Sequence, residues 1–114
     1  MNTVTLEVRS LADTLTDVAA AMETLTPSAP RISFETLELL WKVLTVKRWQ
    51  LIEALTGAGP VTIREAARRV QRDVKAVHGD VHALLNAGLL DKTEDGKIVF
   101  PYDAIHVDFM VKAA

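Results

Sequence analysis

The stretch that most constrains the fold runs from residue 62 to residue 100, where two amphipathic helical patterns are separated by a short polar turn. Thr62 can cap the first helix by accepting a hydrogen bond from one of its free amide groups. Apolar residues then recur three and four positions apart, which is the spacing of one helical face. These residues are Ile63, Ala66, Ala67 and Val70. Because two of them are alanines, we expect a face that a second helix can approach closely.

The second pattern predicts a longer helix after a two-residue turn. Gln71 and Arg72 form this turn, and Asp73 is a good N-cap for the helix that follows. One face of this helix is apolar and contains Val74, Val77, Val81, Leu84 and Leu85. Gly88 suits the end of the helix, because glycine adopts the left-handed conformation that many helix ends require.

Residues 89–100, LLDKTEDGKIVF, predict a β-hairpin, because Asp95–Gly96 between two apolar runs favours a tight turn. Helix, turn, helix and hairpin in this order are typical of a winged helix-turn-helix, which places its second helix in the major groove of DNA. We therefore expect a mainly α fold with a small β component, built as a winged helix-turn-helix with an N-terminal strand-helix extension.

The beginning of the chain predicts this extension. Residues 2–9 alternate between apolar and polar side chains, as a half-buried strand does. Ser10 can cap a helix that follows, and the segment TPSAP ends it as a short stiff linker. We assign residues 1–30 to an extension for dimerisation or partner binding, and residues 31–114 to the winged helix-turn-helix domain.

Other parts of the second domain have weaker patterns. We expect one helix from about Phe34 to Val43, capped by Ser33, and another over residues 46–56. Residues 104–111 alternate again and predict a strand. A two-stranded wing cannot accommodate the alternating segments at the two ends of the chain, so they can pair with each other, within one chain or between two.

Composition and charge exclude several classes of protein. Apolar residues make up 49% and charged residues 25%, so the chain can bury a core. It has no cysteine, which excludes disulfides and thiolate metal sites. We find neither a membrane span nor a signal peptide and expect a cytoplasmic protein. The net charge is −2, but residues 61–90 hold five basic and three acidic residues. Positive charge is therefore concentrated where DNA would be contacted.

The exposed side of the second helix carries most of the candidate DNA contacts. Arg72 lies at its N-terminus, where helices commonly meet phosphate. The first helix would cross the DNA backbone, and the hairpin turn would reach the minor groove. The candidate DNA-binding residues are Arg69, Arg72, Lys75, His78, Gly79, His82 and Lys97.

Several of these residues have a plainer interpretation. Helical pairs with a polar turn also occur in proteins that never touch DNA. A glycine inside a helix costs up to ~1 kcal/mol relative to alanine. Close approach of DNA and close packing against another protein segment explain Gly79 almost equally well. Arg69 and its neighbours can form a solvated face paired with Glu65.

His78 and His82 are four positions apart, which is the spacing of two metal ligands on one helix face. The chain has no cysteine, and its one other histidine is His106. We therefore favour solvated or base-contacting histidines over metal ligands and expect no metal site and no cofactor.

The predicted N-terminal helix is acidic and amphipathic, with Asp13, Asp17 and Glu23 on it. We favour a dimerisation or docking helix, and the alternative is a binding site for a basic protein such as a nuclease toxin. The sequence has no phosphate-binding glycine loop, no nucleophilic triad with sequence context and no paired carboxylates. We therefore do not expect an enzyme.

The segment from Ser33 to Val111 resembles small bacterial and archaeal winged-helix regulators related to the MarR and ArsR groups. The matching residues are SFETLELLWKVLT, KRWQLIEAL, REAARRVQRDVKAVHGDVHALLNAGLL and FPYDAIHVDF. The resemblance implies a DNA-binding transcriptional regulator, and in some cases an antitoxin that neutralises a small toxin and represses their shared promoter. It places Arg72, Lys75, His78, Gly79 and His82 on the recognition helix. The cysteine pair of ArsR metal sensors is absent.

These observations together predict a sequence-specific regulator of transcription that binds double-stranded DNA and represses its own promoter. We expect a homodimer, because repressors usually bind paired half-sites. A small toxin protein is a further expected partner. The alternative is a winged-helix interaction module that binds a partner protein without reading DNA.

Overall fold

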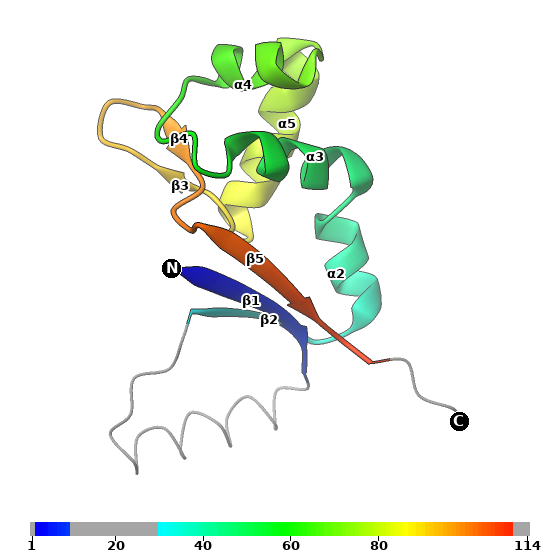
Figure 1. Cartoon of the computed structure of the whole chain (residues 1–114). Coiled ribbons are helices and arrows are strands. Elements are labelled where there is room, and N and C mark those ends of the chain that lie inside the picture. The colour runs from blue at the N-terminus through cyan, green and yellow to red at the C-terminus, as the bar shows by residue number, and fades with distance from the viewer. Residues whose placement is uncertain (1, 10–29, 111–114) are drawn as a thin grey trace. The chain divides into compact units, whose positions relative to one another are not determined.

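The computed structural model describes residues 2–9 and 30–110 of the 114-residue chain (Figure 1). These residues belong to two compact units. One lies within Met1–Trp41 and Ala104–Ala114, and the other is Lys42–Asp103. The helix predicted after Ser10 and the end of the strand predicted at Val111 lie outside the described residues.

The first unit contains a three-stranded parallel sheet with β1 (Thr3–Val8) at its centre. β2 (Arg31–Phe34) pairs with one edge of β1, and β5 (Ala104–Asp108) pairs with the other (Figure 1). Val4 and Leu6 on the central strand are completely buried. The alternation at the start of the chain thus predicted a strand correctly, and its pairing with the C-terminal alternating segment is confirmed within one chain.

The expected mainly α fold, a winged helix-turn-helix with an N-terminal strand-helix extension, is wrong. The described residues form an α/β structure with this parallel sheet and a separate two-stranded antiparallel sheet. The error arose at residues 31–34, which we expected to lead into a helix. Ile32 and Phe34 instead alternate with Arg31 and Ser33 along β2, and Leu6 of β1 lies opposite Ile32.

α2 (Leu37–Val43) follows β2 and therefore begins later than predicted. The Thr36 hydroxyl accepts a hydrogen bond from the Leu39 amide at 3.2 Å, the contact of an N-cap. Thr36, rather than Ser33, thus occupies the capping position. Trp41 on α2 makes an edge-to-face contact with Phe109, which follows β5, with ring centroids 5.8 Å apart.

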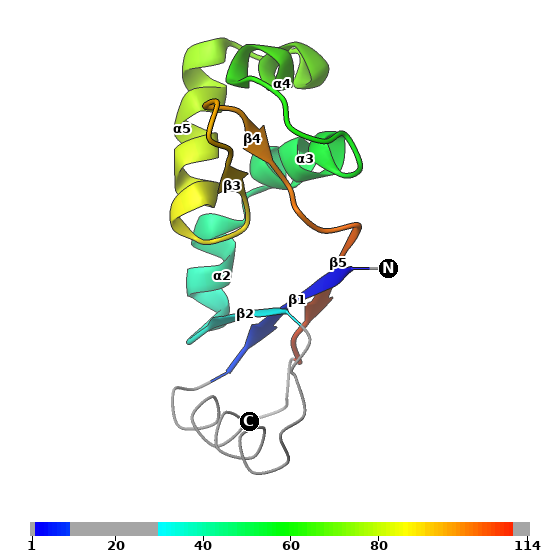
Figure 2. The same cartoon turned by 90° about the vertical axis from the view of Figure 1, so that its left-hand side faces the viewer.

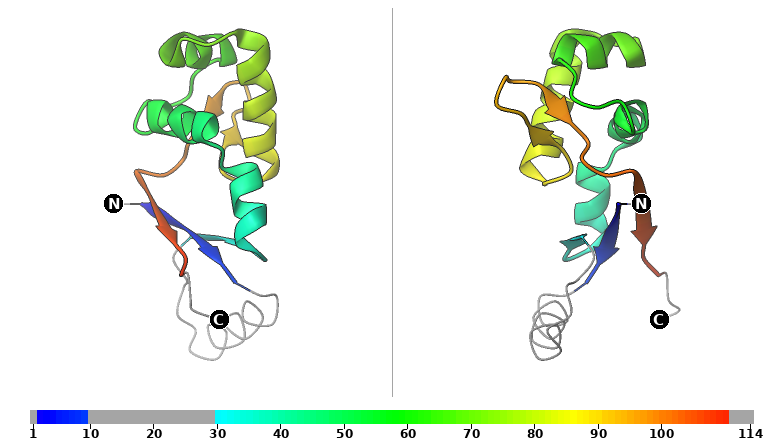
Figure 3. Two further views of the ribbon diagram at one scale, coloured as in Figure 1. Left: turned by 90° about the vertical axis from the view of Figure 1, so that its right-hand side faces the viewer. Right: turned by 60° about the vertical axis from the view of Figure 1, so that its left-hand side comes forward.

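The second unit contains α3 (Val46–Leu55), α4 (Ile63–Val70) and α5 (Val74–Asn86), followed by the hairpin of β3 (Asp91–Lys92) and β4 (Ile98–Val99) (Figure 2). Its buried apolar residues include Leu51, Ile52, Leu55, Ala66, Ala67, Val77, Val81, Leu84, Leu89 and Ile98. α4 packs against both α3 and α5, and Figure 3 shows it crossing the start of α5. The small Ala66 and Ala67 side chains permit this close packing.

The helices in this unit begin at side-chain caps, as the nearby sequence predicts. The hydroxyls of Thr45 and Thr62 accept hydrogen bonds from the third amide of α3 and of α4, and Asp73 accepts one from Lys75 at the start of α5. Gln71 adopts the left-handed conformation in the turn between α4 and α5, with φ of 55°. The caps predicted at Thr62 and Asp73 and the two-residue turn are confirmed.

The hairpin is short, and its second strand is bridged to the segment that precedes α4. Asp91 lies opposite Val99 and Lys92 opposite Ile98. Ile98 also forms an isolated antiparallel bridge with Val61, the residue just before the α4 cap. The turn predicted at Asp95–Gly96 is present, with Gly96 at φ of 83°. No helix in the described parts of the chain is long and apolar enough to cross a membrane.

Candidate nucleic-acid interface

One side of α5 is buried and the other is open to solvent. Val77, Val81 and Leu84 on the buried side have no exposed surface. Four of the predicted contact residues, Lys75, His78, Gly79 and His82, are all exposed. The helical period therefore gives these four residues a solvent-facing position while the apolar stripe holds α5 against its neighbours.

A single carboxylate fixes the start of α5. Asp80 accepts a hydrogen bond from Arg48 Nε at 3.0 Å, and its other oxygen lies 2.7 Å from Arg72 Nη2. The three side chains are only 16–22% exposed. This cluster, which we call the Asp80 clamp, connects α3, the turn and α5.

Arg48 extends the clamp to the preceding segment. Its Nη1 donates hydrogen bonds to the carbonyl oxygens of Lys42 and Val43 at 3.1 and 3.0 Å. Burial raises the pKa of Asp80, but the hydrogen bond from Arg48 and the nearby Arg72 guanidinium lower it more, so the pKa lies below its ordinary value. Asp80 is therefore ionised at neutral pH and holds both cations.

Gly79 lies in the middle of α5 and has open space in front of it. A Cβ built on Gly79 would meet nothing within 4 Å in the described structure. Close packing of another segment was one explanation for this glycine. No segment of the described residues packs against it. The helix carries the cost of a glycine at an exposed position where the described residues supply no contact that needs one.

His78 and His82 lie side by side on the exposed side of α5. Their Nε2 atoms are 3.1 Å apart and share a hydrogen bond, and their ring centroids are 4.3 Å apart. In this arrangement one Nε2 carries the proton and the other accepts it.

The basic side chains of α4 are held by Glu65. Arg68 donates two hydrogen bonds to this carboxylate, and Arg69 Nε donates one at 3.0 Å. The hydrogen bonds from Arg68 and then Arg69 lower the pKa of Glu65 to about 2. Arg69 therefore stands in the solvated, Glu65-paired face that we considered as its plainer interpretation, and it would have to leave Glu65 to contact phosphate.

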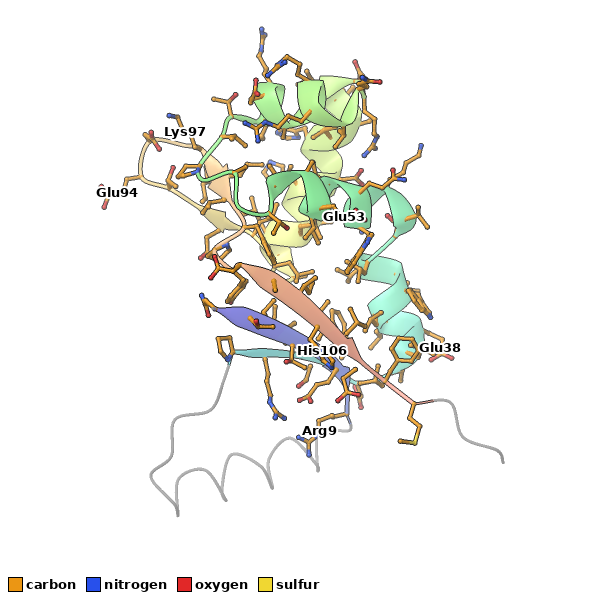
Figure 4. The ribbon with its side chains drawn as sticks, viewed as in Figure 1. Arg9, Glu38, Glu53, Glu94, Lys97 and His106 are labelled. Carbon is orange, nitrogen blue, oxygen red and sulfur yellow. The ribbon has the colours of Figure 1, made fainter. Side chains whose placement is uncertain are left out.

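The hairpin carries the last predicted contact, Lys97. Figure 4 shows Lys97 and Glu94 on the loop between β3 and β4. The Lys97 amide donates to the Thr93 hydroxyl at 3.0 Å, and its Nζ lies 3.7 Å from Asp95 Oδ2. A hydrogen bond from Thr93 lowers the pKa of Asp95 first, and the charge of Lys97 adds to this effect. The Lys97 side chain is nevertheless 44% exposed.

The seven predicted residues thus fall into different environments. The exposed side of α5 brings four of them together. Arg72 is turned into the Asp80 clamp, Arg69 is paired with Glu65, and Lys97 lies on the hairpin loop.

Sequence reasoning missed Arg48 and Asp80. One signal was available, because Asp80 is the only acidic residue within α5 and adjoins the buried Val81. Its partner Arg48 lies 32 positions away and could not be identified from local spacing.

No group of three or more histidine, cysteine or acidic side chains suitable for a metal ion occurs among the described residues. A protein-family model, HVO_A0114, matches residues 43–107, which include the second unit almost entirely. None of the curated proteins compared with the chain matches it.

Proposed function

The chain belongs to the HVO_A0114 family, and we propose that it is a regulator of transcription that binds double-stranded DNA in a sequence-specific way. In this proposal the exposed side of α5 enters the major groove, which is wide enough to admit a helix. Lys75 and the two histidines would meet base edges, and the neighbouring basic residues would meet phosphates.

The observation that carries the proposal is the open space in front of Gly79. This glycine weakens an exposed helix by up to ~1 kcal/mol relative to alanine, and no described part of the chain occupies the space. A molecule that approaches α5 closely from outside would explain why position 79 is a glycine. DNA is such a molecule, because a helix in the major groove lies against base edges along its exposed side.

The charges of the second unit support an anionic ligand. Lys75 is exposed at the first turn of α5. Arg68, with a side chain 75% exposed, is held by a surface pair with Glu65, and such pairs are weak. Phosphate can therefore compete for it. The Asp80 clamp would act indirectly, by fixing the orientation of α5, and Arg72 would serve as a positioning residue.

A second candidate function is binding of a partner protein without reading DNA. Val74 is 42% exposed at the start of α5 and gives this side an apolar component. In addition, several guanidinium groups nearby are already paired with carboxylates of the same chain. Both observations fit a protein surface, whereas the salt dependence of binding would separate the two functions.

The wider assignment follows from the same proposal. The protein would act as a homodimer on paired half-sites and repress its own promoter. It would work in the cytoplasm, where it meets the chromosome. Its partner in an antitoxin role would be a small toxin protein, and the acidic N-terminal residues considered for that contact lie outside the described structure.

The test is fluorescence anisotropy of the full-length protein with a labelled duplex from upstream of its own gene. A scrambled duplex of equal length is the control, and both are measured at two salt concentrations, because phosphate contacts weaken as salt rises. We expect tighter binding to the native duplex and a loss of affinity at the higher salt. Equal weak binding to both duplexes would overturn the proposal and favour a protein partner.

A further inference from the structure

We propose that His78 and His82 form a two-ligand binding site for a divalent transition-metal ion such as Zn²⁺, Ni²⁺ or Co²⁺. Both side chains are exposed on α5, and their Nε2 atoms face each other at 3.1 Å. The proposed DNA interface uses the same two histidines for base edges, and metal binding is a second property of the pair. It rests on the geometry of the pair alone and does not depend on the proposed function.

The separation of the two nitrogens fits one metal ion bound by both. A zinc–imidazole bond is 2.0–2.1 Å long, so two such bonds at angles between 90° and 109° require nitrogens roughly 2.9–3.4 Å apart. The observed 3.1 Å lies inside this range. Each ring would turn by roughly 35–45° to direct its Nε2 lone pair away from the other nitrogen and at a shared ion.

The helix maintains this geometry before the metal arrives. Residues four positions apart on an α-helix are neighbours on one face, and paired histidines at this spacing bind zinc in other helices. α5 is anchored on its other side by Val77, Val81 and Leu84. The two ligands are therefore already close, and binding does not have to order the backbone.

The two imidazole nitrogens determine which class of metal ion the site can bind. Without metal, the two Nε2 atoms share one proton in their hydrogen bond. On binding, the ring that carries this proton exchanges it through solvent for one on its Nδ1, so that each neutral ring holds its proton on Nδ1 and both Nε2 lone pairs bind the ion. Imidazole nitrogen suits zinc, nickel, copper and cobalt, whereas magnesium and calcium prefer oxygen ligands.

Because no third ligand of the usual kind stands with the pair in the described residues, the other coordination positions are filled by water. The result is an exchangeable site on the surface rather than a structural one. Its location adds positive charge beside Lys75, on the side of α5 that faces solvent.

The site can be tested on the full-length protein without a polyhistidine tag and without DNA. Isothermal titration with NiCl₂ and with ZnCl₂ measures affinity, and the absorption spectrum with Co²⁺ reports nitrogen ligands. The variants are His78→Gln and His82→Gln. His106→Gln is the matched control, because His106 is the remaining histidine and lies on β5 in the other unit (Figure 4). Circular dichroism checks that each variant is folded.

We expect each α5 variant to lose affinity by roughly tenfold or more, since even outer-shell partners of a metal site are worth 10–100-fold. The control should bind as the wild type does. Metal should also raise the thermal midpoint of the wild type and not that of the His78→Gln variant, because a ligand stabilises the state that binds it. No binding by the wild type at millimolar metal, or equal binding by wild type and both α5 variants, would overturn the proposal. Since DNA is absent, neither outcome bears on the proposed function.

Discussion

The Nη2 atom of Arg72 lies 2.7 Å from the Oδ2 atom of Asp80, so the basic residue at the turn between α4 and α5 points back into its own unit. The same carboxylate accepts a hydrogen bond from Arg48. Arg72 therefore stabilises the position of α5, and the contacts with an outside molecule fall to residues further along the helix. Residues that hold α5 in place are thus separate from the residues that face solvent.

Removal of the shared carboxylate should destabilise the second unit. Replacement Asp80→Asn leaves Arg48 and Arg72 without their anion, and we expect the free energy of unfolding to fall by about 1–3 kcal/mol. Urea unfolding followed by circular dichroism measures this change. Asp91→Asn is the control, because Asp91 is exposed on β3 and surface substitutions usually change stability by less than about 0.5 kcal/mol. Equal stability of the two variants would mean that the Asp80 clamp does not contribute to the free energy of unfolding.

The contribution of Asp80 should depend on pH. Its pKa in the folded protein lies below its ordinary value, so its stabilising effect is present above the unfolded-state pKa of about 3.9 and is lost as pH falls through the lower folded-state pKa. The stability difference between wild type and Asp80→Asn should therefore be largest near about pH 7 and shrink below about pH 3. Urea unfolding at both pH values checks this. A difference that stays constant would show that the carboxylate charge is irrelevant.

The elements of the second unit were largely predictable because their signals are local. Thr62, Asp73 and Gly96 each act on residues within a few positions of themselves, so capping and turn chemistry identified helix starts and the hairpin. Exposure of Lys75 and His82 followed from the helical period.

The parallel sheet was not predictable in the same way. β2 has only four residues, and its pairing with β1 joins Leu6 to Ile32 across a long intervening segment. A strand this short gains its stability from the neighbour it pairs with, and that neighbour is not visible in local spacing. The contact of Arg48 with Asp80 escaped notice for the same reason.

Release of the α4 arginines should strengthen DNA binding. Glu65→Gln removes the anion that holds Arg68 and Arg69, and we expect affinity for the native duplex to rise by up to about fivefold, the value of a surface ion pair. Anisotropy titration measures this rise. Glu53→Gln removes the same charge from an exposed position on α3 (Figure 4) and should have a smaller effect. Equal effects of the two variants would show that only net charge matters.

Lys75 should contribute directly to recognition. If it contacts a guanine, Lys75→Ala should cost about 1–3 kcal/mol of binding free energy at the native site and less at a scrambled one. Lys47→Ala is the matched control, because Lys47 is exposed on α3. Loss of affinity in the control alone, or in neither variant, would remove Lys75 from the interface.

The most direct test of the account combines the stability and the DNA affinity of Gly79→Ala. Alanine should stabilise α5 by up to ~1 kcal/mol, because the added Cβ meets no described atom within 4 Å. If the space in front of Gly79 is occupied by DNA, the same variant should bind the native duplex at least about tenfold more weakly, a loss of roughly 1.4 kcal/mol. Gln50→Ala, exposed on α3, also gains helix propensity and should leave DNA affinity unchanged. A Gly79→Ala variant that is more stable and binds the native duplex as tightly as the wild type would contradict the central claim.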